Sequence, residues 1–165
     1  MRELTLSVKK YAILIAVEEY SSPSIEDVRH AKRDAEEFSK ALTLHGFDAV
    51  DQILLIGSRA TKKAIASEIA KAIKRLQKKD TLVFYYAGHA IQAEGRNYLL
   101  PVDIEPGPIE AIKEASVSAS DLLERFPAEG IEFGIFILDA CRDNPYAPEG
   151  EVGRGLASME STTGE

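Results

Sequence analysis

Cysteine and tryptophan are almost absent from this sequence, and it contains no long apolar run. Its 165 residues include one cysteine and no tryptophan. One thiol cannot form an internal disulfide or a multi-cysteine zinc site, which suits a reducing compartment. No apolar run approaches the roughly 20 residues of a membrane helix, and residues 1–10 lack the apolar core of a signal peptide. We therefore expect a cytoplasmic protein that does not bind membranes.

Acidic residues outnumber basic ones, but the excess is uneven along the chain. There are 27 Asp and Glu against 20 Lys and Arg, which gives a net charge of −7. Between Arg59 and Lys79, however, eight basic residues accompany a single acid, Glu68. An acidic body attracts basic ligands through its long-range field and argues against general binding of nucleic acid. We interpret the basic segment as the solvated face of a helix, because an apolar stripe interrupts its charges.

Short apolar runs alternate with amphipathic segments along most of the chain. Strands buried on both faces have continuous apolar runs, whereas helices show apolar spacings of three and four. The runs predict four buried strands, at residues 11–17, 52–56, 81–86 and 133–138. The spacings predict helices over 27–44, from a Thr61 cap to Leu76, and from Ser118 or Ser120 to Arg125, and a hairpin is expected over 91–100. Such alternation gives an α/β fold, with a mostly parallel sheet and helices on both faces.

A histidine and the only cysteine follow two of the predicted strands. His89 comes three residues after the third strand, and Cys141 comes three residues after the fourth. The carboxyl ends of parallel strands meet at one edge of a sheet, where functional groups collect. An imidazole near a thiol lowers the pKa of the thiol or takes its proton, which makes the sulfur a nucleophile. Either residue alone is more often structural, but together they predict a Cys–His catalytic dyad.

Two short motifs frame these residues, Tyr85-Tyr-Ala-Gly-His89 and Asp139-Ala-Cys-Arg142. They resemble the histidine and cysteine motifs of caspases, metacaspases and paracaspases. The histidine and the cysteine are 52 positions apart, close to the ~50 of the caspase pattern. Two further features resemble most closely the bacterial metacaspase (orthocaspase) type. They are an acid where caspases carry glutamine, and the run Gly-Arg-Asn-Tyr-Leu-Leu-Pro-Val-Asp over 95–103. The resemblance covers about residues 10–144 and implies the large-subunit domain of a caspase-hemoglobinase-like three-layer sandwich.

The resemblance implies a hydrolase, a thiol protease that acts as a cysteine endopeptidase in proteolysis. Its substrates are proteins or peptides, cut after arginine or lysine. Cys141 attacks the peptide carbonyl to form a thioester, and His89 acts first as base and then as acid. The backbone N–H groups of Cys141, Gly88 and Ala90 are the expected oxyanion hole.

Two aspartates are the expected substrate-binding residues. Asp139 shares a sheet face with Cys141 if the strand continues that far, and a carboxylate there needs a partner such as a substrate guanidinium or ammonium. The segment from Val28 to Ala35 resembles the metacaspase segment whose aspartate lines the specificity pocket, which implies the same role for Asp34. The alternatives are an Asp139 satisfied by backbone N–H groups or by Arg142, and an Asp34 that is only an exposed helical acid.

Two features depart from the family pattern. Ala90 stands where the family usually has glycine, and a turn with positive φ would strain an alanine. No buried strand is predicted after Asn144, whereas the resemblance implies two further strands from a small subunit. We therefore expect a large-subunit domain over 1–145 and a mobile tail or processing linker over 146–165. A small-subunit segment or a partner chain would complete the sheet, because an unpaired edge invites pairing.

Two other functions stay open at this point. The first is a catalytically incomplete caspase-like module that acts by binding or dimerisation and needs a small-subunit partner. The second is a receiver-like or flavodoxin-like signalling domain, for which we find neither the acceptor aspartate after the third strand nor a phosphate-binding loop. No cofactor is expected. Calcium activates many metacaspases, but the sequence has no carboxylate cluster with the spacing of a calcium loop.

Overall fold

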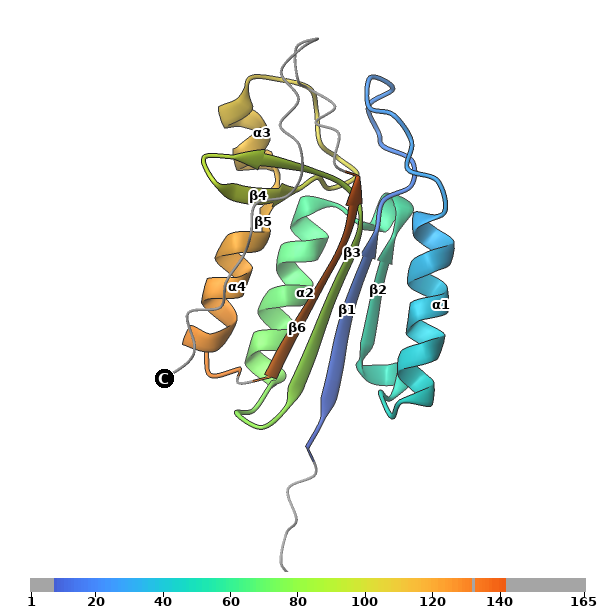
Figure 1. Ribbon diagram of the computed structural model, residues 1–165, viewed down its shortest axis with the longest axis vertical. Coiled ribbons are helices and arrows are strands. Elements are labelled where there is room, and N and C mark those ends of the chain that lie inside the picture. The colour runs from blue at the N-terminus through green and yellow to red at the C-terminus, as the bar shows by residue number, and fades with distance from the viewer. Residues whose placement is uncertain (1–7, 132, 142–165) are drawn as a thin grey trace, which may run out of the picture.

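The computed structural model describes residues 8–131 and 133–141, the side chain of Cys141 excepted. Its centre is a sheet with helices on both faces, as predicted (Figure 1). The parallel strands of this sheet lie in the order β2-β1-β3-β6. They are β1 (Lys10–Ala16), β2 (Gln52–Ile56), β3 (Thr81–Ala93) and β6 (Phe133–Cys141). The predicted tail over 146–165 lies outside the described residues.

A small antiparallel extension continues from the end of β3. It consists of β4 (Arg96–Leu99) and β5 (Val117–Ser118), and β4 pairs with both β3 and β5. Glu94 and Gly95 connect β3 to β4 with φ of 52° and 75°, the left-handed values of a two-residue type I′ hairpin turn. The predicted hairpin is thereby confirmed. The predicted end of the third strand at residue 86 is wrong, because the first arm of this hairpin is β3 itself.

Four helices cover the sheet in the described part of the chain. They are α1 (Ala31–Leu44), α2 (Lys62–Arg75), α3 (Ile109–Ala115) and α4 (Ala119–Ala128). Two short 3₁₀ turns flank β2, η1 (Ala49–Asp51) and η2 (Gly57–Arg59). In Figure 1, α1 lies on one side of the sheet, and α2 and α4 lie on the other. No helix in residues 8–131 or 133–141 has the length and apolar character needed to cross a membrane.

Helix ends follow the capping chemistry of the sequence, with one correction. The hydroxyl of Thr61 accepts the N–H of Ala64 at 3.2 Å, and that of Ser118 accepts the N–H of Asp121 at 3.1 Å. Both caps were predicted. The first helix was expected from residue 27, but α1 begins at Ala31 because His30 is left-handed, with φ of 72°. The short helix α3 was not predicted, since its seven residues are too few to show a periodic stripe.

Two apolar clusters, one on each face of the sheet, form the core. Alternate residues of β3 face opposite sides, as strand geometry requires. Phe84 packs in the cluster that includes Ile65 of α2 and Phe126 of α4. Val83 packs in the cluster that includes Ala35 of α1. Burying each large side chain stabilises the fold by ~1.5–3 kcal/mol, so the central strands form a rigid platform beneath their carboxyl ends.

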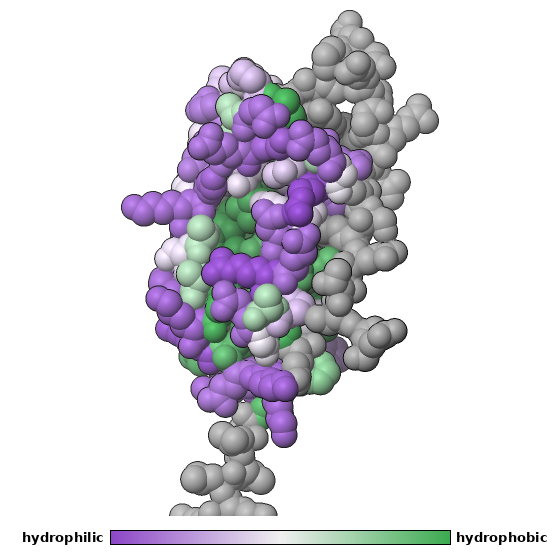
Figure 2. Space-filling view, turned by 90° about the vertical axis from the view of Figure 1, so that its left-hand side faces the viewer, coloured by the Kyte–Doolittle hydropathy of each residue, from purple (hydrophilic) through white to green (hydrophobic). Residues whose placement is uncertain are grey.

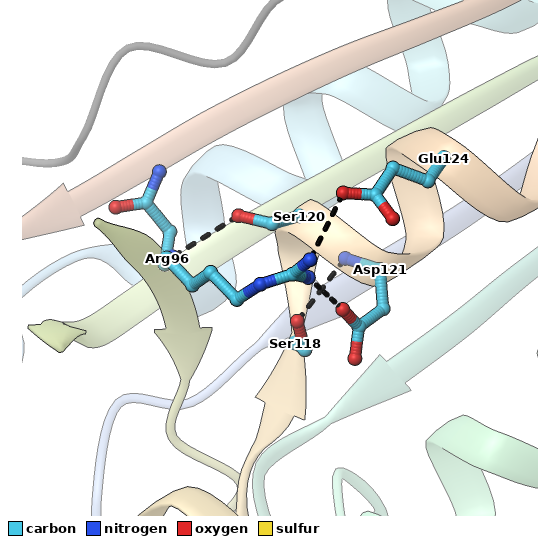
Figure 3. Close-up of polar contacts among 6 residues, drawn as sticks. Arg96, Ser118, Ser120, Asp121 and Glu124 are labelled. Atoms are coloured by element: carbon cyan, nitrogen blue, oxygen red, sulfur yellow. Dashed lines mark hydrogen bonds and ion pairs between the residues drawn. The ribbon is translucent and has the colours of Figure 1, made fainter. Parts of the chain in front are cut away.

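Ion pairs tie the hairpin to α4, as Figure 3 shows. The guanidinium of Arg96 on β4 contacts the carboxylates of Asp121 and Glu124 on α4. Beside it, the N–H of Asn97 donates to the hydroxyl of Ser120 at 3.2 Å. These contacts hold β4 in place, and β4 in turn pairs with the last residues of β3.

Candidate active site

His89 and Cys141 lie opposite each other on adjacent parallel strands. The register of β3 and β6 pairs Ala87 with Asp139, Gly88 with Ala140 and His89 with Cys141. Neighbouring strands are ~4.8 Å apart, so the backbones of the two predicted dyad residues are in adjacent positions. The fourth strand was expected to end at residue 138, but β6 continues to Cys141. The sequence suggested that both residues follow their strands, but each lies within its strand.

The imidazole of His89 is buried, and among the described residues only its Nε2 has a hydrogen-bond partner. The residue is 6% exposed, and Nε2 lies 2.8 Å from the backbone carbonyl oxygen of Glu26. A carbonyl only accepts, so Nε2 of the neutral ring carries the proton and Nδ1 has the free lone pair. Within the described part of the chain, Nδ1 makes no hydrogen bond. A buried polar atom without a partner is unusual and is expected at catalytic positions.

Sequence reasoning missed Glu26, and no signal in the sequence could have found it. Its contribution is a main-chain carbonyl, which every residue possesses. The contact joins residues 63 positions apart, and it forms because the segment after β1 returns over the end of the sheet. Backbone hydrogen bonds fix that return: the N–H of Ser21 donates to Val102, and the N–H of Val28 donates to Glu18.

Gly88 and Ala90, the expected oxyanion-hole residues, flank His89 within β3. Ala90 pairs with Leu99 of β4, and the N–H of Leu100 donates to the carbonyl of His89 at 3.0 Å. In an antiparallel ladder, hydrogen-bonded and non-bonded pairs alternate, so the N–H of Ala90 is directed away from β4. The anticipated strain at Ala90 is absent, because its φ is not positive.

Asp139 lies beside the phenol of Tyr85, and the charge of Asp34 also acts on that phenol. Tyr85 is buried under α1, with its ring centroid 5.0 Å from that of Phe38. Its hydroxyl is 3.5 Å from Oδ2 of Asp139, which is exposed at the end of β6. Asp34 stands in the first turn of α1, 3.5 Å from the guanidinium of Arg33, and its side chain is 44% exposed. Of the two predicted substrate-binding acids, Asp139 contacts this phenol, and Asp34 acts on it through its charge.

The two acids and the burial act together on Tyr85. Burial is the largest effect, and with the negative charges of Asp139 and Asp34 it raises the pKa of Tyr85 to about 12. At neutral pH the phenol is therefore protonated and donates to Asp139. The site edge accordingly carries two carboxylates with a neutral donor beneath them. A cation is the ligand that such an arrangement attracts.

No metal site accompanies these acids. Among residues 8–131 and 133–141, no three His, Cys, Asp or Glu side chains gather closely enough to hold an ion. The other two histidines lie at the ends of α1, at its N-cap and C-cap positions. The structure does not bring either to His89.

The fold and the motifs were compared with known proteins. Residues 9–163 match the family model described as "Caspase domain". Among solved structures, the crystal structure of protein GSU0716 from Geobacter sulfurreducens is similar to the chain, with a TM-score of 0.60 and 17% identity. The similarity covers 81% of this chain and 50% of that one, so the chain spans about half the length of the Geobacter protein. No curated protein matches the chain.

Proposed function

Because the chain belongs to the caspase domain family, a family of cysteine peptidases, we propose that it is an endopeptidase of metacaspase type. It cuts peptide bonds after arginine or lysine, with His89 and Cys141 as its catalytic dyad. The observation that carries this proposal is the pairing of His89 with Cys141 on adjacent parallel strands. Nδ1 of His89 supports it, because this buried atom makes no hydrogen bond to the described residues and a general base needs a free lone pair.

The reaction is acyl transfer through a thioester. His89 takes the proton of the Cys141 thiol, and the sulfur attacks the carbonyl carbon of the substrate. The oxyanion that forms is held by the N–H of Cys141, with the N–H of Ala90 or Gly88 as second donor. His89 then protonates the departing amine and the C–N bond breaks. Water attacks the thioester with His89 as base, which releases the acid and restores the thiol.

The specificity for basic residues is supported by the charges around Tyr85. Asp139 lies two residues before Cys141, and Asp34 also acts on the same phenol. A substrate guanidinium is planar and binds carboxylates through two parallel hydrogen bonds. Asp139 and Asp34 are therefore the proposed binding residues for the side chain that precedes the cleaved bond.

The first experiment tests the dyad with fluorogenic peptides that end in Arg, Lys or Asp. We expect wild-type cleavage after Arg or Lys and none after Asp. Cys141→Ala and His89→Ala should each lower kcat/KM by at least about 10³-fold, because each removes a group needed for thioester formation. The matched control is His45→Ala, which removes an exposed imidazole at the end of α1.

The outcomes are separable. Substantial cleavage by Cys141→Ala would remove the cysteine from the mechanism. Cleavage only after Asp would keep the dyad and remove the basic specificity. The assay is run with added calcium and with a chelator, because the proposed reaction uses no cofactor and should proceed in both.

A second prediction concerns Asp139. Asp139→Asn keeps the shape of the side chain but removes its charge, so kcat/KM for Arg peptides should fall by ~10–100-fold. The loss should appear mainly in KM, since the charge binds the ground state and the transition state alike. Glu105→Gln is the control, because it removes one exposed negative charge elsewhere. An unchanged preference for Arg would exclude Asp139 from the pocket.

A second candidate function follows from the free edge of β6. In the described residues β6 pairs only with β3, and Phe133 and Ile135 on it are 57% and 51% exposed. We propose that a small-subunit segment or partner chain adds a strand at this edge and covers these side chains. Without that strand the chain is a catalytically incomplete module that acts by binding or dimerisation. A thiol probe separates the two, since only an assembled site reacts selectively at Cys141.

A further inference from the structure

Tyr20 lies against the imidazole of His89. The two ring centroids are 5.3 Å apart, with their planes 32° from parallel. Both side chains are buried, with Tyr20 8% and His89 6% exposed. Tyr20 belongs to the segment between β1 and α1, the same segment that supplies the carbonyl of Glu26 to Nε2. One short stretch of chain therefore contacts both a face and an edge of the ring.

The hydroxyl of Tyr20 also bonds the backbone of His89. It accepts the N–H of His89 at 2.7 Å, which is at the short end of the range for N–H···O hydrogen bonds. On the other side, the hydroxyl of Tyr86 lies 2.5 Å from the carbonyl of His89 and 2.8 Å from that of Leu100. Tyrosine hydroxyls thus contact both main-chain polar groups of His89.

Gly88 makes this arrangement possible. A Cβ at this position would lie 2.6 Å from the hydroxyl oxygen of Tyr86 and 3.1 Å from that of Tyr20. The first distance is a clash, and the second is so tight that the hydroxyl of Tyr20 would also have to shift. Gly88 is therefore needed for the approach of the two hydroxyls. The space that its missing side chain leaves is occupied by the groups that contact the main chain of His89.

From these contacts we infer that Tyr20 is a positioning residue for His89. It acts through the ring contact, through the N–H of His89, and through the segment that carries Glu26. Together these hold the imidazole with Nε2 on the Glu26 carbonyl and Nδ1 available to the thiol of Cys141. A misplacement of about 1 Å at a reacting group can cost ~10²-fold in rate. The expected effect of Tyr20 on catalysis rests on the proposed function, whereas its effect on the position of the His89 ring does not.

The test measures both consequences. Tyr20→Phe keeps the ring and removes the hydrogen-bond acceptor, and Tyr20→Leu removes both. Tyr11→Phe is the matched control, because Tyr11 is also buried but lies near the amino end of β1. The kinetic readout is kcat and KM on Arg peptides, corrected for the fraction of reactive Cys141. The structural readout is the ¹⁵N resonance and hydrogen exchange of the His89 Nε2–H.

We expect kcat of Tyr20→Phe to fall by about ten-fold or more, with KM within about two-fold of wild type. We also expect the Nε2–H of His89 to exchange faster in Tyr20→Phe and fastest in Tyr20→Leu. Tyr11→Phe should change neither quantity.

Two results would overturn the inference: an unchanged kcat in Tyr20→Phe, or an Nε2–H as protected in both Tyr20 variants as in wild type. Tyr20→Phe keeps the test valid if Tyr20→Leu does not fold. If the wild type cleaves no peptide, the exchange measurement still decides the positioning role. If the wild type cleaves no peptide and the His89 Nε2–H exchanges faster in the Tyr20 variants, the result would support the role of Tyr20 and count against the proposed function.

Discussion

At the scale of single residues, the surroundings of each functional group decide its chemistry. Tyr85 and Tyr86 are adjacent in one motif, yet β-strand alternation sends them to opposite faces of the sheet. Tyr86 contacts the carbonyl of His89, whereas the hydroxyl of Tyr85 lies beside the carboxylate of Asp139 and has a raised pKa. The same type of side chain therefore contacts His89 on one face and Asp139 on the other.

This difference predicts how Tyr85 titrates. Its phenol should ionise near pH 12, detected by ultraviolet titration and assigned with Tyr85→Phe. Because the folded-state pKa lies above the ordinary 10.0, the folded state holds the proton more tightly. This stabilisation is complete below about pH 10 and is lost as pH rises toward 12. In Asp139→Asn the midpoint should move only part of the way to 10, because burial is the larger cause.

An alkaline titration in which Tyr85 ionises near the ordinary pKa of 10.0 would contradict this assignment. So would a midpoint that Asp139→Asn leaves unchanged, since that would place the carboxylate away from the phenol.

At the scale of elements, the helix caps stabilise the layers that support the sheet. The first turn of α2 receives two side-chain acceptors: the Thr61 hydroxyl bonds the N–H of Ala64, and Asp103 bonds the N–H of Lys62 at 2.9 Å. The second bond joins α2 to the segment after β4. The cap therefore links a local helix signal to a contact that only the folded chain forms.

A prediction follows for α2. Thr61→Ala should lower the free energy of unfolding by about 1 kcal/mol, because it leaves the N–H of Ala64 without its acceptor. Thr61→Ser is the control and should stay close to wild type, since it keeps the hydroxyl. Denaturant unfolding measures the change, with an unchanged m-value expected for a two-state domain. A loss equally large in Thr61→Ser would mean that packing of the methyl group matters more than the cap.

At the scale of the whole molecule, polarity is distributed unevenly. Figure 2 shows hydrophilic side chains around apolar areas on the face that carries α4 and the hairpin. The basic segment runs the length of α2: Arg59, Lys62 and Lys63 follow the carboxyl end of β2, and the last charges lie in the turn before Thr81, near the amino ends of the parallel strands. The proposed site lies at the opposite, carboxyl ends, where Asp34 and Asp139 stand. Asp34 and Asp139 are therefore the charges proposed to attract a basic substrate to this end.

The edge of β6 that is unpaired among residues 8–131 and 133–141 leads to a prediction about association. A strand edge with exposed Phe133 and Ile135 should promote reversible self-association, measured by analytical ultracentrifugation. Ile135→Lys should reduce it, because a charge on an edge strand opposes pairing. Val50→Lys adds the same charge at another exposed apolar residue, 77% exposed on η1, and should have no effect. Equal effects of both variants would attribute association to net charge.

The sequence by itself determined the layers and the family to which the chain belongs. The run at 52–56 coincides with β2, and the helix from the Thr61 cap coincides with α2 to within one residue at its end. Apolar periodicity reports which side chains are buried, so it fixes each element locally. The motifs around His89 and Cys141 identified the caspase domain family because they combine two residue types at a fixed separation.

Tertiary structure alone decided how these residues meet. The extension of β3 through His89 depends on β4, and the start of α1 depends on a left-handed His30. The carbonyl of Glu26, the phenol of Tyr20 and the approach of Asp34 to Tyr85 all join segments far apart in sequence. Main-chain carbonyls and long-range approaches leave no periodic trace, because they depend on how packed layers place one segment over another.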